Sequence, residues 1–237
     1  MIRSQHTVWV AILLAGCGNP PQTSGPDPGG PVATREEGDS PPRDAALPAA
    51  TVEEQKSATH PAAADPIASL ELLGARFTRN GQVVVSLNLS NTQITDADLV
   101  HLQTLSELKH IYLFNTPISD RGLVYLKHLK ELEELSLART AITDNGLSQL
   151  AELTRLETLD LSLCRQIKGS GLKHFKSMSR LKELLLYQTQ VGDASLDHLA
   201  QMTHLDYIVL PDVTVSESGL AALQKSLPDC DIIKQDY

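Results

Sequence analysis

The sequence predicts an α/β solenoid of tandem repeats that occupies residues 84–228. Two apolar residues separated by one position recur along the chain, and leucines spaced every three residues follow each pair. No single copy can bury both apolar stretches, whereas stacked copies can, and a fixed period of this length indicates a repeat architecture. The pairs are Leu87/Leu89, Ile111/Leu113, Leu135/Leu137, Leu159/Leu161, Leu184/Leu186 and Ile208/Leu210, at successive steps of 24, 24, 24, 25 and 24 residues.

Each apolar pair predicts a short strand, because alternate residues of a strand point to opposite faces. The leucines at three-residue spacing, such as Leu147, Leu150 and Leu153, predict one buried face of a helix. Six stacked copies would form a short right-handed arc, with a parallel sheet on the concave side and helices on the convex side.

Two sets of polar residues recur after the strands, and each set forms a column when the copies are stacked. In the first column, a small side chain that can form hydrogen bonds with the backbone of the turn stands five residues after the first strand leucine. An acidic residue then stands where each helix begins, which predicts helix capping, with a ladder of calcium sites as the alternative. The first column is Thr92, Thr116, Thr140, Cys164 and Thr189, and the second includes Asp96, Asp120, Asp144 and Glu217.

The run Ile142-Thr-Asp-Asn-Gly-Leu147, repeated in part at Ile94–Leu99, resembles the cysteine-containing leucine-rich repeats known from F-box proteins. The fourth copy, with Cys164 in the small-residue column, is nearest to that form. Bacterial leucine-rich repeat lipoproteins carry similar copies. The resemblance implies a leucine-rich repeat fold and leaves the partner open, because such repeats serve many functions.

Residues 1–17 predict an export signal, with a short apolar core at Val8–Leu14. The tetrapeptide Leu14-Ala15-Gly16-Cys17 resembles the lipobox of bacterial lipoproteins. That resemblance implies a lipid on Cys17 and a location in the cell envelope, at the outer membrane or the outer face of the cytoplasmic membrane. The folded domain would lie in the periplasm or outside the cell. An ordinary secretory signal with a chance cysteine is the alternative.

Three further segments flank the repeats. Residues 18–64 are rich in proline and alanine and predict a disordered tether. Residues 65–83 predict an N-terminal cap, a helix followed by a hairpin that turns at Asn80-Gly81. Residues 229–237 predict a C-terminal cap strand and tail.

Charge and motif content exclude several functions. The formal net charge is -9 and no lysine-arginine cluster is present, which disfavours nucleic-acid binding. No catalytic or cofactor-binding motif is found, so we expect no enzyme, cofactor or metal. Histidines at His101, His174 and His198 recur at one helical position, which is typical of a solvated helix face, although a pair could bridge a metal. Cys164 and Cys230 are expected too far apart for a disulfide.

The predicted site lies on the sheet. Residues that flank the strand leucines must point away from the core, and aromatic rings gather there although aromatics make up 4% of the chain. Aromatic anchors beside polar residues are typical of protein interfaces. Rings that only shield the sheet are the alternative. The predicted binding residues are His110, Tyr112, Phe114, Glu134, Arg139, Asp160, Glu183, Tyr187 and Tyr207.

The fourth copy differs from the others by one extra residue near Arg165-Gln166. It also carries Lys168, Lys173 and Lys176, a basic spot on an acidic chain. A tolerated loop insertion is one interpretation. A secondary contact site for an acidic partner is the other.

The sequence as a whole favours a membrane-tethered, monomeric, non-enzymatic module that binds a protein or peptide of the cell envelope. A structural spacer or self-associating scaffold is the main alternative. A glycan hydrolase using Glu134, Asp160 and Glu183 is a remote one. It is disfavoured because an open, solvated sheet offers nothing that would raise the pKa of one of these carboxyl groups.

Overall fold

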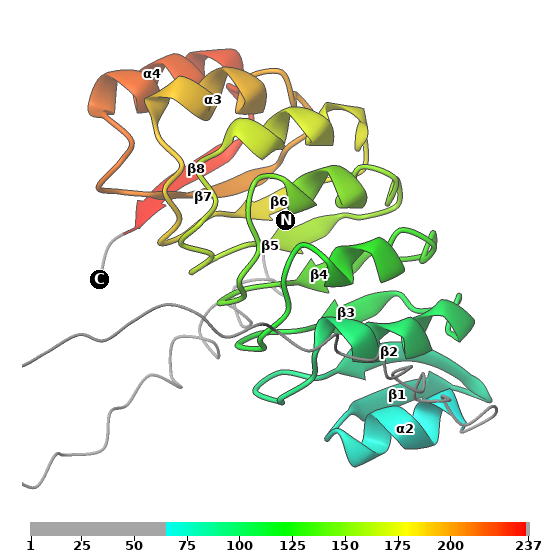
Figure 1. Cartoon of the computed structure of the whole chain (residues 1–237). Helices are drawn as coiled ribbons and strands as arrows, with labels where there is room; N and C mark the ends of the chain where they lie inside the picture. Colours follow the sequence, from blue (N-terminus) through cyan, green and yellow to red (C-terminus); the bar gives the residue numbers. More distant parts are fainter. Residues whose placement is uncertain (1–64, 236–237) are drawn as a thin grey trace, which may run out of the picture. The chain divides into compact units, whose positions relative to one another are not determined.

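The computed structural model describes residues 65–235, which belong to a compact unit spanning residues 57–237 (Figure 1). One eight-stranded sheet runs through these residues, and its strands lie side by side in chain order. The strands are β1 (Arg76–Asn80), β2 (Val83–Asn88), β3 (His110–Tyr112), β4 (Glu134–Ser136), β5 (Thr158–Asp160), β6 (Glu183–Leu185), β7 (Tyr207–Pro211) and β8 (Asp231–Gln235).

The sheet is parallel from β2 to β8, and its register follows the repeat. Equivalent core residues of neighbouring copies stand directly opposite each other, as Leu87 does with Ile111 and Leu135 with Leu159. These residues are fully buried. The predicted solenoid is confirmed.

The helices all lie on the same side of the sheet (Figure 1). Those of the first four repeats are 3₁₀ helices rather than α-helices. Their leucines recur every third residue, which a 3₁₀ helix with three residues per turn aligns on one side. The last two repeats keep this spacing at Leu196/Leu199 and Leu220/Leu223 but form α-helices, so the spacing alone does not determine the helix type. The helices are η1 (Asp96–Thr104), η2 (Gly122–Tyr125), η3 (Gly146–Leu150), η4 (Ser170–Ser177), α3 (Asp193–Leu199) and α4 (Glu217–Ser226).

The N-terminal end of the solenoid is closed by helix α2 (Pro66–Leu72) and the antiparallel pair β1 and β2. The Asp65 carboxylate accepts a hydrogen bond from the backbone N–H of Ile67 and so caps α2. The hairpin turns at Gly81-Gln82, one residue later than predicted. Glycine suits the turn because its φ there is +62°.

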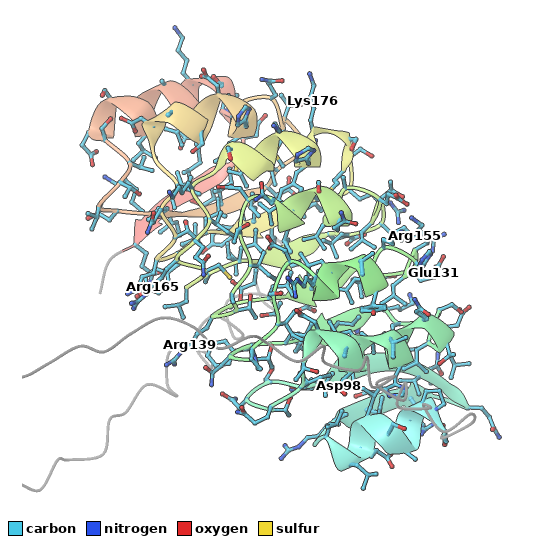
Figure 2. All side chains as sticks on the ribbon, in the orientation of Figure 1. Asp98, Glu131, Arg139, Arg155, Arg165 and Lys176 are labelled. Atoms are coloured by element: carbon cyan, nitrogen blue, oxygen red, sulfur yellow. The ribbon has the colours of Figure 1, made fainter. Side chains whose placement is uncertain are left out.

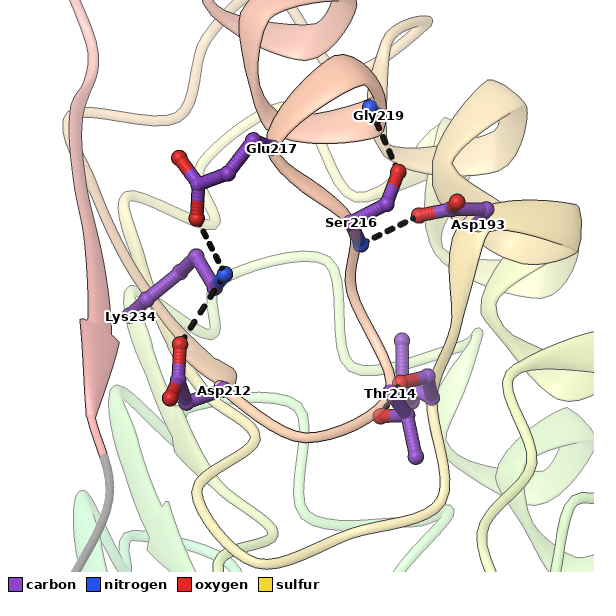
Figure 3. Close-up of polar contacts among 8 residues, drawn as sticks. Asp193, Asp212, Thr214, Ser216, Glu217, Gly219 and Lys234 are labelled. Atoms are coloured by element: carbon purple, nitrogen blue, oxygen red, sulfur yellow. Dashed lines mark hydrogen bonds and ion pairs between the residues drawn. The ribbon is translucent and has the colours of Figure 1, made fainter.

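The C-terminal end is closed by β8, whose five residues pair with β7. Lys234 lies between two carboxylates, with its Nζ 2.9 Å from Asp212 and 2.7 Å from Glu217 (Figure 3). Its side chain is only 13% exposed, so the last strand is held to both the preceding loop and α4. Lys234 and Gln235, predicted as tail, therefore belong to the strand.

The threonine column acts as predicted. Its hydroxyls donate hydrogen bonds to the carbonyl of the residue three positions earlier, at 2.6–2.7 Å. Cys164 occupies the same position, and its thiol donates to the carbonyl of Leu137 in the preceding repeat, at 3.1 Å. Cys164 and Cys230 are both buried free thiols, which confirms the prediction of no disulfide between them.

A column of left-handed backbone follows the strands and was not predicted. One residue in each of the first five repeats has a φ between 51° and 64°. Asn115 donates a side-chain hydrogen bond to Asn91 at 2.8 Å, so two of these turns are linked. The column consists of Asn91, Asn115, Arg139, Leu163 and Gln188.

The export signal, Cys17 and the proline-rich segment lie outside the described residues, so their predicted roles remain predictions. In the part that the structure describes, no helix has the length and apolar character needed to cross a membrane.

Candidate functional site

The concave face is formed by three columns of side chains that point away from the core. They stand in register across β2 to β7, because each strand pairs with the equivalent residues of the next. The first column is Ser86, His110, Glu134, Thr158, Glu183 and Tyr207; the second is Asn88, Tyr112, Ser136, Asp160, Leu185 and Val209; the third is Ser90, Phe114, Ala138, Ser162, Tyr187 and Pro211.

The four predicted aromatic residues, Tyr112, Phe114, Tyr187 and Tyr207, are all partly exposed on this face. None of them lies in the hydrophobic core, and no described helix covers the sheet on this side (Figure 1). Each ring therefore keeps part of its surface exposed on this face.

Tyr112 and Glu134 form a pair between neighbouring strands. The phenol donates a 3.0 Å hydrogen bond to Oε2 of Glu134. Burial of the phenol, followed by the nearby carboxylate of Glu134, raises the pKa of Tyr112 well above its usual range. The hydroxyl is therefore protonated at neutral pH, and the bond holds the ring across the sheet.

The other rings have polar neighbours as well. The Tyr187 hydroxyl accepts a hydrogen bond from the side-chain amide of Gln188 at 2.9 Å. Burial raises the pKa of Tyr207, and the carboxylates of Asp231 and Glu183 add to the effect. Tyr112 and Tyr187 thus combine an apolar ring with a hydrogen-bonded hydroxyl, which is a common arrangement at protein interfaces.

The centre of the concave face is less exposed than predicted. Asp160 was expected to contact a partner, but it is only 5% exposed, and Ser136 and Ala138 are also buried. Their strand neighbours in the same columns are larger, namely Tyr112 and Leu185 beside the serine and aspartate. Because no other described element covers this side, neighbouring side chains must shield them. The prediction of an accessible Asp160 is wrong.

Asp160 instead belongs to the hydrogen-bond structure of the sheet. Its carboxyl accepts from the backbone N–H of Ser162 at 2.9 Å and from the hydroxyl of Ser136 at 3.2 Å. Burial raises the pKa of this carboxyl, against the smaller opposing effect of the hydrogen bonds. The argument that nothing raises an acid's pKa on this sheet is therefore wrong for Asp160. Its burial nevertheless keeps it from a substrate.

Asp160→Asn is expected to stabilise the fold at neutral pH. The raised pKa means that the folded state binds the proton more tightly than the unfolded chain, so ionisation costs stability. In the wild type this loss grows as pH rises from about 4, the ordinary Asp pKa, through the raised value. A tenfold change in proton affinity corresponds to about 1.4 kcal/mol. Urea unfolding of both proteins from pH 3 to pH 8 measures this loss of stability. The variant should be more stable than the wild type at neutral pH and equally stable at the acidic end of the range.

Asp193→Asn provides the opposite control. The backbone N–H of Ser216 donates to the Asp193 carboxylate at 2.9 Å (Figure 3). Hydrogen bonding to the Ser216 side chain, followed by this backbone N–H, lowers the pKa of the Asp193 carboxyl. A lowered pKa gives stability that is present at neutral pH and lost as pH falls through the folded value. This variant should therefore lose stability at pH 7. A destabilised Asp160→Asn at pH 7 would contradict the assignment of a burial cost.

Arg139 does not lie on the concave face. It occupies the left-handed turn after β4, is exposed, and extends from the loops at the same edge as Arg165 (Figure 2). The three columns therefore contain partly exposed carboxyl groups at Glu134 and Glu183 and a buried one at Asp160, but no lysine or arginine. An acidic, aromatic surface results.

The acidic column after the strands joins successive repeats. Asp96, Asp120 and Asp144 were predicted to cap their own helices, but their carboxylates accept hydrogen bonds from the next repeat, which corrects the prediction. Asp193, which was not predicted, does the same. Asp144 alone accepts three, from the backbone N–H groups of Lys168, Gly169 and Gly171 at 2.9, 3.0 and 2.9 Å. The other carboxylates bind Ser119 (Asp96), Thr143 (Asp120) and Ser216 (Asp193).

These carboxylates explain a column of glycines that was not predicted. A Cβ on Gly122 would lie 2.6 Å from Oδ1 of Asp96, and one on Gly171 would lie 2.5 Å from the backbone carbonyl of Asp144. Gly146 and Gly219 face Asp120 and Asp193 in the same way. The signal in the sequence was a glycine that recurs at one position of the repeat, in Gly122, Gly146, Gly171 and Gly219.

The junction between the fourth and fifth repeats reverses the arrangement. Gly169 stands where four other repeats have aspartate, and Ser195 stands where four other repeats have glycine. A Cβ on Gly169 would collide with the side chain of Ser195. The space is therefore filled once at each junction, by a carboxylate from one repeat or by a hydroxymethyl group from the next.

The geometry supports neither of the two alternative metal sites, the histidine pair and the calcium ladder. Within residues 65–235, no group of three or more histidine, cysteine, aspartate or glutamate side chains could hold a metal ion. His101, His174 and His198 are partly exposed along the row of helices. The aspartates that might have formed a calcium ladder instead accept backbone hydrogen bonds.

Comparisons with known proteins agree with this architecture. The sequence pattern of the family described as "Leucine Rich repeat" matches residues 128–151 and 153–175. Comparison with curated proteins gave no match.

Three solved structures resemble the chain. One is an internalin (inlF) from Listeria monocytogenes, with 20% identity and a TM-score of 0.50, covering 70% of this chain and 54% of that one. Internalin C2 (inlC2) of the same organism has 23% identity and a TM-score of 0.52, covering 71% and 81%. A leucine-rich repeat protein of Leptospira interrogans has 19% identity and a TM-score of 0.44, covering 56% and 39%.

The chain spans about half the length of the first internalin. At these identities the similarity concerns the fold. Together with the matched repeats and the in-register parallel sheet, it shows that residues 65–235 form a leucine-rich repeat solenoid.

Proposed function

We propose that the domain binds a protein or peptide on its concave face and carries out no catalysis. The observation that supports this is the set of partly exposed aromatic side chains, held in register on a sheet face that no described helix covers. Aromatic side chains supply much of the binding energy of protein interfaces. The adjacent carboxylates of Glu134 and Glu183 disfavour an acidic partner.

The bound segment would contact two aromatic groups on either side of the shielded centre. Tyr112 and Phe114 lie on the N-terminal side of Asp160, and Tyr187 and Tyr207 on the C-terminal side. In the third column only the small residues Ala138 and Ser162 stand between Phe114 and Tyr187. An extended segment crossing the strands would meet both groups.

In the test, the immobilised unit 57–237 and its double variant Tyr112→Ala/Tyr187→Ala are each used to capture binding proteins, and the captured proteins are compared. Loss of two aromatic anchors should weaken binding of the captured protein at least about tenfold. The control variant Leu72→Ala/Val213→Ala removes side chains that are 91% and 84% exposed away from this face, and it should bind normally. Equal capture by all three proteins would refute the concave site.

We further propose that a lipid on Cys17 holds this module at a membrane of the cell envelope. The support is the tetrapeptide Leu14-Ala15-Gly16-Cys17 after a short apolar core. Cys17→Ser should move the protein from the membrane fraction to the soluble fraction. Unchanged fractionation would refute the lipid anchor.

A self-associating spacer is the competing function. Sedimentation equilibrium of the unit 57–237 distinguishes the two, because a spacer should dimerise or polymerise whereas a binding module of this kind should remain monomeric.

A further inference from the structure

The convex side of the fourth repeat has an unusual charge distribution. Residues 161–182 contain six lysines and arginines and no aspartate or glutamate, although the whole chain has a net charge of -9. Four of these cations, here called the basic belt, lie on η4 and the turns that flank it, and all four side chains are exposed. The basic belt is Lys168, Lys173, Lys176 and Arg180.

The local structure directs these side chains outward. Leu172, Phe175 and Met178 occupy every third position and are fully buried. In a 3₁₀ helix, residues three apart lie on the same side, so Lys173 and Lys176 share one exposed side. Figure 2 shows Lys176 extending outward from the row of helices.

The basic belt differs from three other cations of the convex side and its edges, which are paired. Lys130, Arg155 and Lys182 pair with acidic residues of a neighbouring repeat. Within residues 65–235, the side chains of the basic belt form no such ion pair or hydrogen bond. Asp197 is the only acidic residue at an equivalent position in an adjacent repeat. The four charges are therefore not neutralised by the fold.

We propose that the basic belt binds the surface of a bilayer containing anionic phospholipids. Lysine is depleted from protein interfaces, where arginine and aromatic residues are enriched, and the basic belt has three lysines and no exposed aromatic neighbour. Clusters of basic side chains are attracted to anionic lipid headgroups. Exposed Ser170, Ser177 and Ser179 lie between the cations and can donate hydrogen bonds to phosphate oxygens.

The shape of the domain fits a flat surface. The helices form the convex side of the arc, and η4 is the fourth of the six helices that accompany the repeats, near the middle of that row. A flat surface can touch a convex arc along only one stretch at a time, and the basic belt lies within one such stretch. Contact through the basic belt would leave the concave face directed away from the bilayer, although the proposal does not depend on the function of that face.

Co-sedimentation of the unit 57–237 with vesicles tests the proposal. The unit contains the complete core and both caps, so it is expected to fold without the preceding segment. The vesicles consist of phosphatidylcholine, with or without phosphatidylglycerol as the minor component. Binding is expected only with phosphatidylglycerol, and it should be lost when salt rises from about 0.1 M to about 1 M, where the Debye length falls to about 3 Å.

Substitutions test whether the basic belt is responsible for the binding. Each cation at an anionic surface contributes roughly a fivefold factor, so Lys168→Gln/Lys173→Gln/Lys176→Gln/Arg180→Gln should reduce partitioning by more than about 100-fold. The control Arg76→Gln/Arg79→Gln/Arg121→Gln/Lys225→Gln removes the same net charge elsewhere and should retain most of the binding. Circular dichroism verifies that both variants are folded.

Several results would overturn the proposal. Equal binding to both vesicle types would show that anionic lipid is not recognised. Equal losses in the two variants would show an effect of net charge alone. Binding of polyglutamate without binding of phosphatidylglycerol vesicles would assign the basic belt to an acidic protein instead.

Discussion

Gly171→Ala is expected to lower the free energy of unfolding by about 3 kcal/mol. The new methyl group would lie 2.5 Å from the backbone carbonyl oxygen of Asp144 and 2.9 Å from Cδ1 of Leu147. The carbonyl belongs to the main chain of the third repeat and cannot rotate away as a flexible side chain could. The two repeats must therefore separate, which also disturbs the hydrogen bonds to the Asp144 carboxylate. Urea unfolding of the unit 57–237, followed by circular dichroism, measures the loss.

Ser195→Ala is the matched control, because position 195 is the equivalent site in the next repeat and already carries a Cβ. The change removes one hydrogen bond, from the Ser195 hydroxyl to the carbonyl of Gly192 at 2.7 Å, and should cost about 1 kcal/mol or less. Equal losses in the two variants would contradict the steric explanation for the glycine.

Asp144→Asn is expected to destabilise the domain by about 2–3 kcal/mol. Oδ1 accepts two backbone N–H groups and Oδ2 accepts a third, so both oxygens are needed as acceptors. An amide can replace only one oxygen, and its NH₂ group would face a backbone donor. At least one N–H at the start of η4 would then lose its partner. Hydrogen exchange should show faster amide exchange at Lys168, Gly169 or Gly171.

Asp197→Asn is the control for this substitution. Asp197 is exposed, and its side chain forms no hydrogen bond or ion pair among residues 65–235, so the same change of charge should alter stability by less than about 0.5 kcal/mol. Asp160→Asn should shift stability in the other direction at pH 7. Destabilisation of similar size in Asp144→Asn and Asp197→Asn would indicate a general effect of charge and contradict the role of the three donors.

The strands and the threonine column could be predicted because they depend on local spacing. Alternation around Leu135 and Leu137 defines a strand, and the fixed step to the next copy defines which residues lie opposite each other. The helical segments could be located from the three-residue spacing of leucines such as Leu147 and Leu150, but their 3₁₀ character could not, because Leu196 and Leu199 have the same spacing in the α-helix α3. These features need no knowledge of side chains from other repeats.

The features that were not predicted depend on contacts between repeats. Asp120 looks like a helix cap in sequence, and only its position against Thr143 shows that it binds the following repeat. Asp160 occupies an outward position, but its accessibility is decided by the size of its neighbours on β4 and β6. Arg139 follows an outward residue, yet its positive φ turns it to the loop edge.

The alternation of aspartate and glycine at the junctions restricts how this gene could lengthen. If the fifth repeat were duplicated, Ser195 of the copy would face Asp193 of the original, and the two side chains would occupy the same space. If the third repeat were duplicated, Asp144 of the original would face Gly146 of the copy, and the two repeats could pack as they do now. Only repeats that carry both the aspartate and the glycine are therefore expected to be duplicated next to themselves. A serine can replace the glycine only where the preceding repeat has lost its aspartate.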